Sequence, residues 1–354
     1  MRRPSTTRSL AAPSVLPQQN CSIDFESVAC LHCGGHDFQT VIECGDRLTQ
    51  LGGHFRVVRC QACGLAFTNP RPTERSIGLF YPETYSPYSK RKLRTDRKKT
   101  IQHRLEHAVL RSHFGYPPQP TSAKTVMMGA VGWALIRTTR RRNSWIPFRA
   151  PGRLLDFGCG AGNYMKRMRA HGWSVEGIDF SPRIAEQLRQ SAGLRAHVGT
   201  LPHPDILPDS FDAITMWHSL EHVHAPRGVL RAAREALRPG GLLVVGVPNF
   251  GSWAFRRFQH HWKGLDLPRH LTHFTPQTLT PMVEAERFRV LSVAQVGHGR
   301  LVRESARRAH NAGSSGLTTW AFRPLASKFV SDRIANWAER TGQGDRIWMI
   351  AEKV

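Results

Sequence analysis

The stretch Arg153-Leu-Leu-Asp-Phe-Gly-Cys-Gly-Ala-Gly162 decides the fold of this chain. Its first residues suit a short buried strand, and they run directly into a glycine-rich turn that a helical pattern follows. Glycines at such a turn let the backbone bend sharply and approach a ligand closely. A second predicted strand, residues 174–179, ends in Asp179, where a carboxylate can accept both ribose hydroxyls of an adenosine. This unit therefore predicts a site for a nucleotide-like ligand.

Strands and helices alternate along the rest of the chain, which indicates βαβ units around a parallel sheet. The predicted fold class is therefore α/β with a Rossmann-like sheet. A kinase P-loop is not expected, because no Gly-Lys-Ser or Gly-Lys-Thr follows the glycines, and the third glycine comes one residue early for a dinucleotide fingerprint. The pattern predicts helices over 163–171, 181–191, 226–237 and 275–286, and further strands over 211–217, 242–247, 290–296 and 347–354.

Four motifs resemble class I S-adenosylmethionine-dependent methyltransferases, in the family's order and spacing: 156–162, 176–182, 211–222 and 239–245. The resemblance implies S-adenosylmethionine as the cofactor and an antiparallel last strand. It also implies that the glycine loop holds the amino-acid end of the cofactor, that Asp179 holds the ribose, and that Thr200 and Leu201 flank the adenine. The candidate cofactor-binding residues are Asp156, Gly158, Gly160, Gly162, Asp179, Thr200, Leu201, Trp217 and His218.

Two cysteine pairs have the same form, Cys30-Leu-His-Cys33-Gly and Cys60-Gln-Ala-Cys63-Gly, and 26 residues separate them. Such knuckles can point four thiolates at one tetrahedral ion, and the glycine permits a turn that aims N–H groups at sulfur. We expect a structural Zn²⁺, although iron also binds thiolates. A redox CxxC would explain one pair but not two matched pairs. The remaining cysteines are interpreted as free thiols: Cys21, Cys44 and Cys159.

The cysteine region extends the resemblance. The string 60–72, the run Tyr81-Pro-Glu-Thr-Tyr85 and the segment 250–278 are similar to zinc-ribbon methyltransferases, which occur among sugar C-methyltransferases and in bacterial polysaccharide gene clusters. This resemblance implies a sugar or sugar-nucleotide acceptor of polysaccharide or secondary-metabolite biosynthesis. An O-methyltransferase of a small aromatic compound or natural product is the alternative. An alternative of another class is a zinc-ribbon nucleic-acid-binding protein or an RNA methyltransferase.

The run His218-Ser-Leu-Glu-His222 is the candidate catalytic cluster. On a helix after strand 211–217, His218, Glu221 and His222 can share a face. Read literally it is a zinc-protease H-x-x-E-H, which we reject because the strand-to-helix context belongs to the cofactor fold. Resemblance to the sugar C-methyltransferases implies His222 as the base with Glu221 beside it. Ubiquinone-type O-methyltransferases carry an upstream acid that helps bind a divalent metal, where this chain has His218; alternatively, Glu221 and His222 only cap and pack the helix.

Five further residues are candidates for binding the acceptor. Two tyrosines could close the acceptor side from the N-terminal region, and three residues of the run Leu265–Phe274 could bind phosphate or sugar hydroxyls. The alternative is that they only hold a loop in place. These candidates are Tyr81, Tyr85, Arg269, His270 and His273.

The composition is that of a globular chain with an excess of positive charge. Its 354 residues are 40% hydrophobic and 21% charged, which excludes a largely disordered chain and a disulfide miniprotein. Fifty Lys and Arg against 26 Asp and Glu leave a net charge of +24, which suggests an anionic partner or an arginine-rich composition. We predict four parts: a disordered tail (1–26), a zinc ribbon (27–72), a basic, partly helical linker (73–150), and a methyltransferase domain (151–354) with a polar, weakly helical insertion at about 298–345.

The linker has two basic runs, 90–99 and 137–142, around the apolar segment 125–136. They could rest on an anionic membrane surface, bind nucleic acid through charge, or form a solvated linker. A nucleic-acid partner is not expected, because no aromatic-interleaved RNA motif accompanies them. The chain has no signal-peptide core and no apolar run of the ~18–20 residues that span a membrane. A cytoplasmic location is expected.

Overall fold

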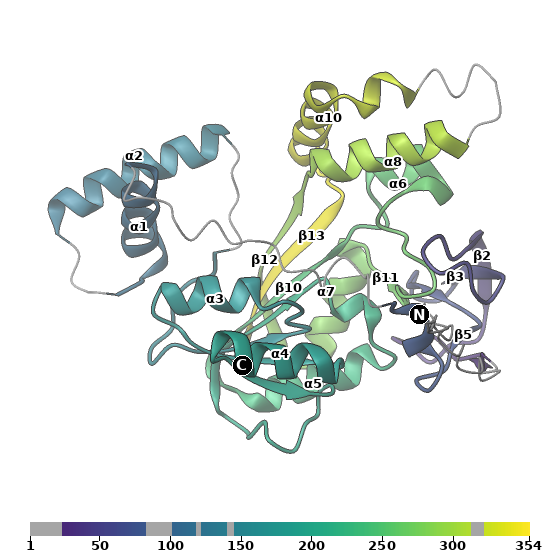
Figure 1. The fold of residues 1–354 in the computed structure, drawn as a ribbon, viewed down its shortest axis with the longest axis horizontal. Helices are drawn as coiled ribbons and strands as arrows, with labels where there is room; N and C mark the ends of the chain where they lie inside the picture. Colours follow the sequence, from purple (N-terminus) through teal and green to yellow (C-terminus); the bar gives the residue numbers. More distant parts are fainter. Residues whose placement is uncertain (1–22, 83–100, 118–121, 140–144, 313–321) are drawn as a thin grey trace, which may run out of the picture.

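A computed structural model of the chain describes residues 23–82, 101–117, 122–139, 145–312 and 322–354 (Figure 1). Its centre is a seven-stranded sheet with the order β12-β13-β10-β9-β6-β7-β8. Strand β13 runs antiparallel to both of its neighbours, whereas β6 to β10 are parallel to one another. This arrangement confirms the predicted α/β, Rossmann-like class. The strands are β6 (Arg153–Phe157), β7 (Ser174–Asp179), β8 (Arg195–Val198), β9 (Phe211–Trp217), β10 (Leu237–Pro248), β12 (Phe288–Val296) and β13 (Arg346–Lys353).

Helices cover both faces of this sheet, which explains why its central strands are almost continuously apolar. On one face α3 (Asn163–Ala170) and α4 (Pro182–Ala192) pack over Leu154 and Val244. On the other face α5 (Pro226–Ala236) and α7 (Pro276–Ala285) pack over residues such as Ile214. Local sequence sets the helix ends, because the Ser181 side chain caps α4 and Gly193 ends it in the left-handed conformation.

The cysteine region forms a second, four-stranded sheet with the order β11-β4-β3-β2. Two of its features differ from the prediction. Residues of the expected tail form strand β1 (Phe25–Glu26), which pairs with β5 (Arg71–Pro72). The edge strand β11 (Thr272–His273) comes from the other end of the chain and pairs with β4 (Ala66–Thr68). The remaining strands are β2 (Phe38–Gly45) and β3 (His54–Cys60), and residues 1–22 lie outside the described part.

Residues 73–150, the expected linker, are largely built into the fold. A short 3₁₀ helix, η1 (Ile77–Phe80), is followed by helices α1 (Ile101–Phe114) and α2 (Ala123–Thr139), which pack together as a hairpin apart from the sheet (Figure 1). The hairpin is anchored to the core through Leu110 of α1, which is buried with Tyr116, Ile146 and residues of α3 and α4. The basic run 90–99 lies outside the described residues, as do the side chains of 137–142.

No helix among the described residues is long and apolar enough to cross a membrane.

The segment expected as a weakly helical insertion is mostly helical. Helices α8 (Gly299–Ala312) and α10 (Lys328–Arg340) pack against one another and, with α6 (Trp253–Phe258), lie beyond the ends of β12 and β13 (Figure 1). The helical period was hidden because the buried stripe of α8 uses small residues: Val302, Ser305, Ala306 and Ala309. The described residues also form three further short 3₁₀ helices: η3 (Leu220–His222), η4 (Gln259–His261) and η5 (Pro324–Ala326).

A substitution at Gly246 of β10 can test how tightly the side chains pack at the edge of the sheet where β9 and β10 end. A Cβ at Gly246 would lie 2.5 Å from a ring carbon of Trp217. Gly246→Ala should therefore lower the free energy of unfolding by about 1–3 kcal/mol, the usual cost of overpacking. Gly228→Ala on α5 is the matched control, since its Cβ would meet only the Cβ of Ala225, at 3.7 Å. Thermal melts that coincide for Gly246→Ala and the wild type would contradict this packing.

Candidate active site

The turn after β6 requires glycine for two separate reasons. Gly158, Gly160 and Gly162 have φ values of 70°, 48° and 68°, in the left-handed region that other residues avoid. Space is also short: a Cβ on Gly158 would lie 2.5 Å from the Cβ of Ser219, and a Cβ on Gly162 would lie 2.5 Å from Leu188 Cδ2. The loop backbone is therefore held close against the turn that follows β9.

Asp179 is held directly beside this loop. Its Oδ2 accepts a hydrogen bond from the Gly160 N–H at 2.9 Å, and its Oδ1 accepts from the Ser181 N–H at 3.0 Å. Burial raises the pKa of Asp179, and the two backbone N–H groups partly oppose that rise. Each carboxylate oxygen still has acceptor capacity for a ligand hydroxyl. The structure thus brings together the loop and the acid that the sequence paired.

Thr200 and Leu201 follow β8 at the same edge. The Gly199 N–H donates to the Asp179 carbonyl at 2.9 Å, so the chain turns beside Asp179. Leu201 is buried and Thr200 is exposed. Both residues therefore lie near the carboxylate that would hold a ribose.

Asp156 lies buried under the glycine loop. Its Oδ1 accepts from the Thr215 hydroxyl at 2.7 Å, and burial raises its pKa to about 7 despite that bond. The ring of Trp217 lies 5.5 Å from the ring of Tyr164, which belongs to the first turn of α3. The Tyr164 hydroxyl and the Trp217 Nε1 are both buried and without a hydrogen-bond partner among the described residues.

Unsatisfied buried polar atoms gather at this edge of the sheet. They include atoms from α3, from the turn after β9, and from the facing ends of β12 and β13. Buried polar groups in folded proteins are nearly always hydrogen-bonded, so such a concentration marks a place where a ligand or water supplies the partners. In the described part of the chain these atoms are Tyr164 OH, Trp217 Nε1, Ser219 Oγ, Glu221 Oε2, His298 Nδ1, Asp345 Oδ2 and Arg346 Nε.

The turn after β9 is not the regular helix that the sequence predicted. His218 takes a φ of 55°, its N–H donates to the Gly246 carbonyl at 2.7 Å, and only η3 follows. The tight turn still brings His218 Nδ1 within 3.3 Å of Glu221 Oε1. The His218 side chain is 40% exposed, yet partial loss of water around the ring, and to a smaller extent the charge of Arg346, lowers its pKa.

His222 points instead toward residues far away in the sequence. Its Nδ1 lies 3.0 Å from the Arg269 carbonyl oxygen and 2.9 Å from the Tyr81 hydroxyl. A carbonyl oxygen can only accept, so Nδ1 carries the proton and Nε2 keeps its lone pair. Burial lowers the pKa of His222 to about 4, helped by His270 and opposed by Glu221. The imidazole is therefore neutral at pH 7, with Nε2 free to take a proton.

Tyr81 connects His222 to the end of β7. Its ring packs edge-on against Phe180 at 4.9 Å, the residue directly after Asp179. The tyrosine thus lies between the carboxylate beside the glycine loop and the neutral imidazole. Tyr85, the other predicted tyrosine, lies outside the described residues.

Glu221 and His270 complete the cluster. Glu221 is 1% exposed, and burial raises its pKa. The His270 ring meets the His222 ring edge-on at 4.7 Å, and its Nε2 lies 4.0 Å from Glu221 Oε1. His270 Nδ1 donates to the Gly264 carbonyl at 2.9 Å, which leaves Nε2 unprotonated. Glu221, His222 and His270 offer the two imidazoles and one carboxylate that bind transition metals more readily than magnesium.

Two predicted acceptor residues have structural roles instead. The Arg269 guanidinium is 1% exposed and is occupied by Asp46 at 2.7 Å, Asp266 at 3.1 Å and the Phe80 carbonyl at 2.9 Å. His273 lies on β11, where its Nε2 lies 3.2 Å from the Thr68 hydroxyl. Sequence reasoning missed Asp46 and Asp266, because nothing local marks them as partners of Arg269.

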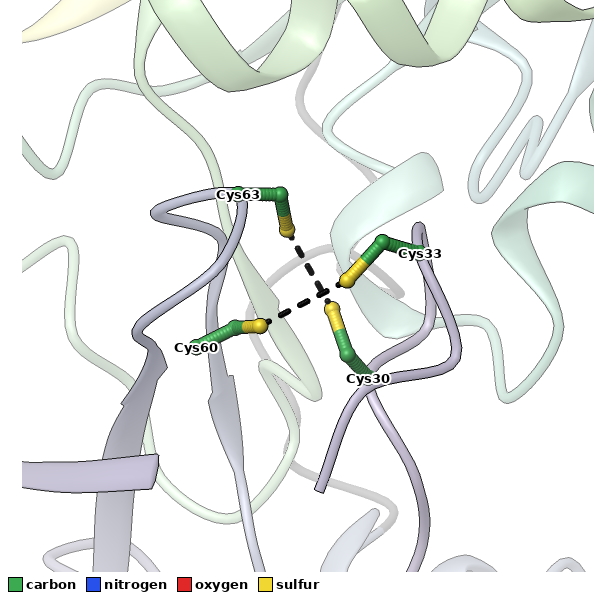
Figure 2. Close-up of side chains that lie close together, drawn as sticks. All are labelled: Cys30, Cys33, Cys60 and Cys63. Carbon is green, nitrogen blue, oxygen red and sulfur yellow. Dashed lines mark hydrogen bonds between the residues drawn. The ribbon is translucent and has the colours of Figure 1, made fainter. Parts of the chain in front are cut away.

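The four predicted cysteines converge on one point (Figure 2). The Sγ atoms of Cys30 and Cys63 lie 3.4 Å apart, those of Cys33 and Cys60 lie 3.5 Å apart, and all four lie within 4.8 Å of one another. Tetrahedral zinc with Zn–S bonds of about 2.3 Å places its sulfurs about 3.8 Å apart. The four thiols therefore fit a single Zn²⁺.

The knuckle backbone suits this role. Gly34 and Gly64 both have a φ of 76°, and each donates its N–H to the carbonyl of the first cysteine of its pair at 2.9 Å. The Gly35 N–H lowers the pKa of Cys33 to about 7, so the turn favours a thiolate there. Cys44 lies on β2, outside the cluster.

Comparisons with known proteins agree with this geometry. A protein-family model described as "Methyltransferase domain" matches residues 134–293. The chain is 35% identical over 117 residues to a ubiquinone biosynthesis O-methyltransferase of Pseudomonas syringae pv. tomato, covering 30% of this chain and 50% of that protein. It is 32% identical over 143 residues to the protein of that name from Xanthomonas oryzae pv. oryzae, covering 34% and 59%. The chain spans about half the length of the curated relatives it matches.

Solved structures of low sequence identity are also similar. A SAM-dependent methyltransferase of Thermotoga maritima, described as a possible histamine N-methyltransferase, has 20% identity and a TM-score of 0.41, covering 58% of this chain and 84% of that one. A SAM-dependent methyltransferase of Archaeoglobus fulgidus has 19% identity and a TM-score of 0.41, covering 63% and 94%.

The position of Asp179 makes a direct prediction about ligand binding. Asp179→Ala should weaken the binding of S-adenosylhomocysteine by about 1.5–3 kcal/mol, the scale for lost hydrogen bonds to a charged group. Isothermal titration measures this loss. Asp332→Ala removes the same charge from α10 and should leave the affinity unchanged. Full affinity in Asp179→Ala, or tight binding of NAD by the wild type, would contradict the assignment of this edge.

Proposed function

We propose that this chain is an S-adenosylmethionine-dependent methyltransferase, as the family match over residues 134–293 supports, and that it methylates a sugar or a sugar nucleotide. The observation that carries the proposal is the meeting of Tyr81 and His222 beside the glycine loop. A neutral, half-buried imidazole with a free Nε2 is a competent general base for a hydroxyl, or for a carbon next to a ketone. The acceptor would then lie at Nε2, on the side of the ring away from the Tyr81 hydroxyl, which contacts Nδ1.

The residues around the glycine loop suit the cofactor. The loop and Asp156 would hold its amino-acid end, Asp179 its ribose, and Thr200 and Leu201 its adenine. The unpartnered Tyr164 hydroxyl and Trp217 Nε1 offer further polar contacts. Bound there, S-adenosylmethionine supplies a methyl group on a positively charged sulfur.

His222 would act on the acceptor through Nε2. The Arg269 carbonyl holds the proton on Nδ1, so the imidazole cannot turn to the wrong tautomer without losing that bond. When Nε2 takes the acceptor proton, the imidazolium gains the nearby negative charges of Glu221 and Asp266, both of which favour the protonated ring. Glu221 and Asp266 thus support the base without touching the acceptor.

A small aromatic acceptor is the second candidate, since the relatives are ubiquinone biosynthesis O-methyltransferases at 32–35% identity. The polar character of the site favours the sugar. Histidines 218, 222, 270 and 298, together with Arg346, face this edge, whereas an aromatic ring is bound mostly by apolar side chains. Histidines and arginine instead offer hydrogen bonds to hydroxyls.

We also propose that the four cysteines hold a structural zinc ion. Inductively coupled plasma analysis of the purified protein should find about one zinc per chain. Cys60→Ser should lose this zinc and loosen the ribbon, because three thiolates leave the tetrahedron open. Cys44→Ser is the matched control and should keep the metal. Full zinc content in the double variant Cys30→Ser/Cys60→Ser would contradict the site.

The proposed role of His222 as the base can be tested by replacing this residue. His222→Ala should lower the rate by about 10²–10⁴, the worth of general-base catalysis, and leave S-adenosylhomocysteine affinity unchanged. The release of S-adenosylhomocysteine with candidate sugar nucleotides measures the rate. His36→Ala, an exposed histidine of the ribbon, is the control.

The pH profile separates a base from a packing residue. A base works only when it is unprotonated, and the pKa of His222 is lowered to about 4. The wild-type rate should therefore stay level through the free imidazole range near ~6.5 and fall only toward pH 4. His222→Ala should lose this acid limb. Wild-type turnover by His222→Ala would show that the imidazole only packs the turn.

A further inference from the structure

Arg346 lies at the same edge of the sheet as the turn after β9, residues 218–222, which we call the catalytic turn. It is the first residue of β13, where it is paired with Pro248 of β10 and Val296 of β12. Residues two apart on a strand share a face, so its side chain leaves the sheet on the same side as Trp348. The Trp348 ring packs against Trp217 at 5.5 Å, next to the glycine-loop helix. Arg346 therefore lies on the face of the sheet where the cofactor would bind.

No salt bridge holds the Arg346 guanidinium among the described residues. In the described part of the chain its Nε is also buried without a hydrogen bond. Other poorly exposed arginines behave differently: Arg71 meets Glu26 at 2.8 Å, and Arg269 meets Asp46 at 2.7 Å. Burial lowers the pKa of Arg346, and the nearby Asp345 and Glu221 only partly oppose that shift. Such a group is costly unless something binds to it.

Two neighbouring side chains also have buried polar atoms without a hydrogen-bond partner among the described residues. These atoms are His298 Nδ1 and Asp345 Oδ2, although Asp345 Oδ1 accepts from the backbone N–H of His298 at 2.7 Å. Burial raises the pKa of Asp345 to about 7, so this carboxyl group neutralises Arg346 only in part. Arg300, which pairs with Glu304, adds to the positive field.

The charged and polar groups around Arg346 also interact with residues of the catalytic turn. The charge of Arg346 acts on His218, and Glu221 acts in turn on Arg346. His298 is influenced by both Arg346 and His218. A ligand at His222 would extend along the sheet edge toward β13, because the His218 N–H donates to Gly246 of β10 and Arg346 pairs with Pro248, two residues further along that strand.

We propose that Arg346, with His298 beside it, binds an oxyanion of the acceptor, either a carboxylate or a phosphate. The inference rests on the proposed function, because it assigns a charged group to that acceptor. A guanidinium binds both kinds of oxyanion through two parallel N–H donors. The site would select acidic sugars or nucleotide-linked sugars over neutral ones.

Titration of the protein saturated with S-adenosylhomocysteine tests this site. Uridine diphosphate serves as the phosphate probe and glucuronate as the carboxylate probe, and we expect one of them to bind. Arg346→Met should weaken that binding about tenfold or more, as expected for a lost charge-assisted pair. Arg346→Lys should bind the probe more tightly than Arg346→Met but more weakly than the wild type, because a lysine ammonium cannot donate two parallel N–H bonds.

The matched control is Arg307→Met, which removes the same charge from an exposed position on α8. It should bind the probe as the wild type does. Equal binding by Arg346→Met and the wild type would overturn the proposal, as would the absence of binding for both probes while S-adenosylhomocysteine still binds. The proposed function fails separately, when a probe binds through Arg346 but no sugar derivative is methylated.

Discussion

The buried ion pairs of Arg269 are the interaction on which the site depends. Asp46 of the ribbon and Asp266 of the loop before β11 both contact this guanidinium, which is 1% exposed. Burying a charge is tolerable only when its partners are in place, and loss of one partner typically costs about 3–5 kcal/mol. Arg269 therefore holds the ribbon and this loop in one arrangement. A movement of Asp46 would remove one of the two carboxylates that balance the buried guanidinium.

Three features of the candidate active site follow from these ion pairs. The Arg269 carbonyl sets the tautomer of His222, and the next residue, His270, packs against the same imidazole. The Leu271 N–H donates to the Glu221 carbonyl at 2.8 Å, while the Leu271 carbonyl accepts from the Thr68 N–H at 2.9 Å. One short segment thus connects the ribbon sheet to the catalytic turn. The ribbon sheet thus lies against one side of the candidate active site.

Burial controls the chemistry of the histidines. It lowers the pKa of His222, His270 and His273 together, so the cluster stays neutral at pH 7 although negative charges lie nearby. A neutral imidazole can accept a proton, whereas one protonated in the ground state cannot. Glu221 is buried beside them, and burial raises its pKa. Close packing thereby keeps His222 in the neutral form that the proposed base role requires.

The amino-acid sequence by itself determined the features that depend on local conformation. The glycine loop, the acid after β7 and the two cysteine knuckles could be predicted because each needs only a few adjacent residues in a required geometry. Only the tertiary structure decided the rest. The contact between Tyr81 and His222, the capture of Arg269 by Asp46, and the position of Arg346 opposite the catalytic turn all join residues far apart in the chain. Their distances depend on how whole elements pack, and even the turn holding Glu221 became a 3₁₀ helix rather than an α-helix because Gly246 and Leu271 bind its backbone.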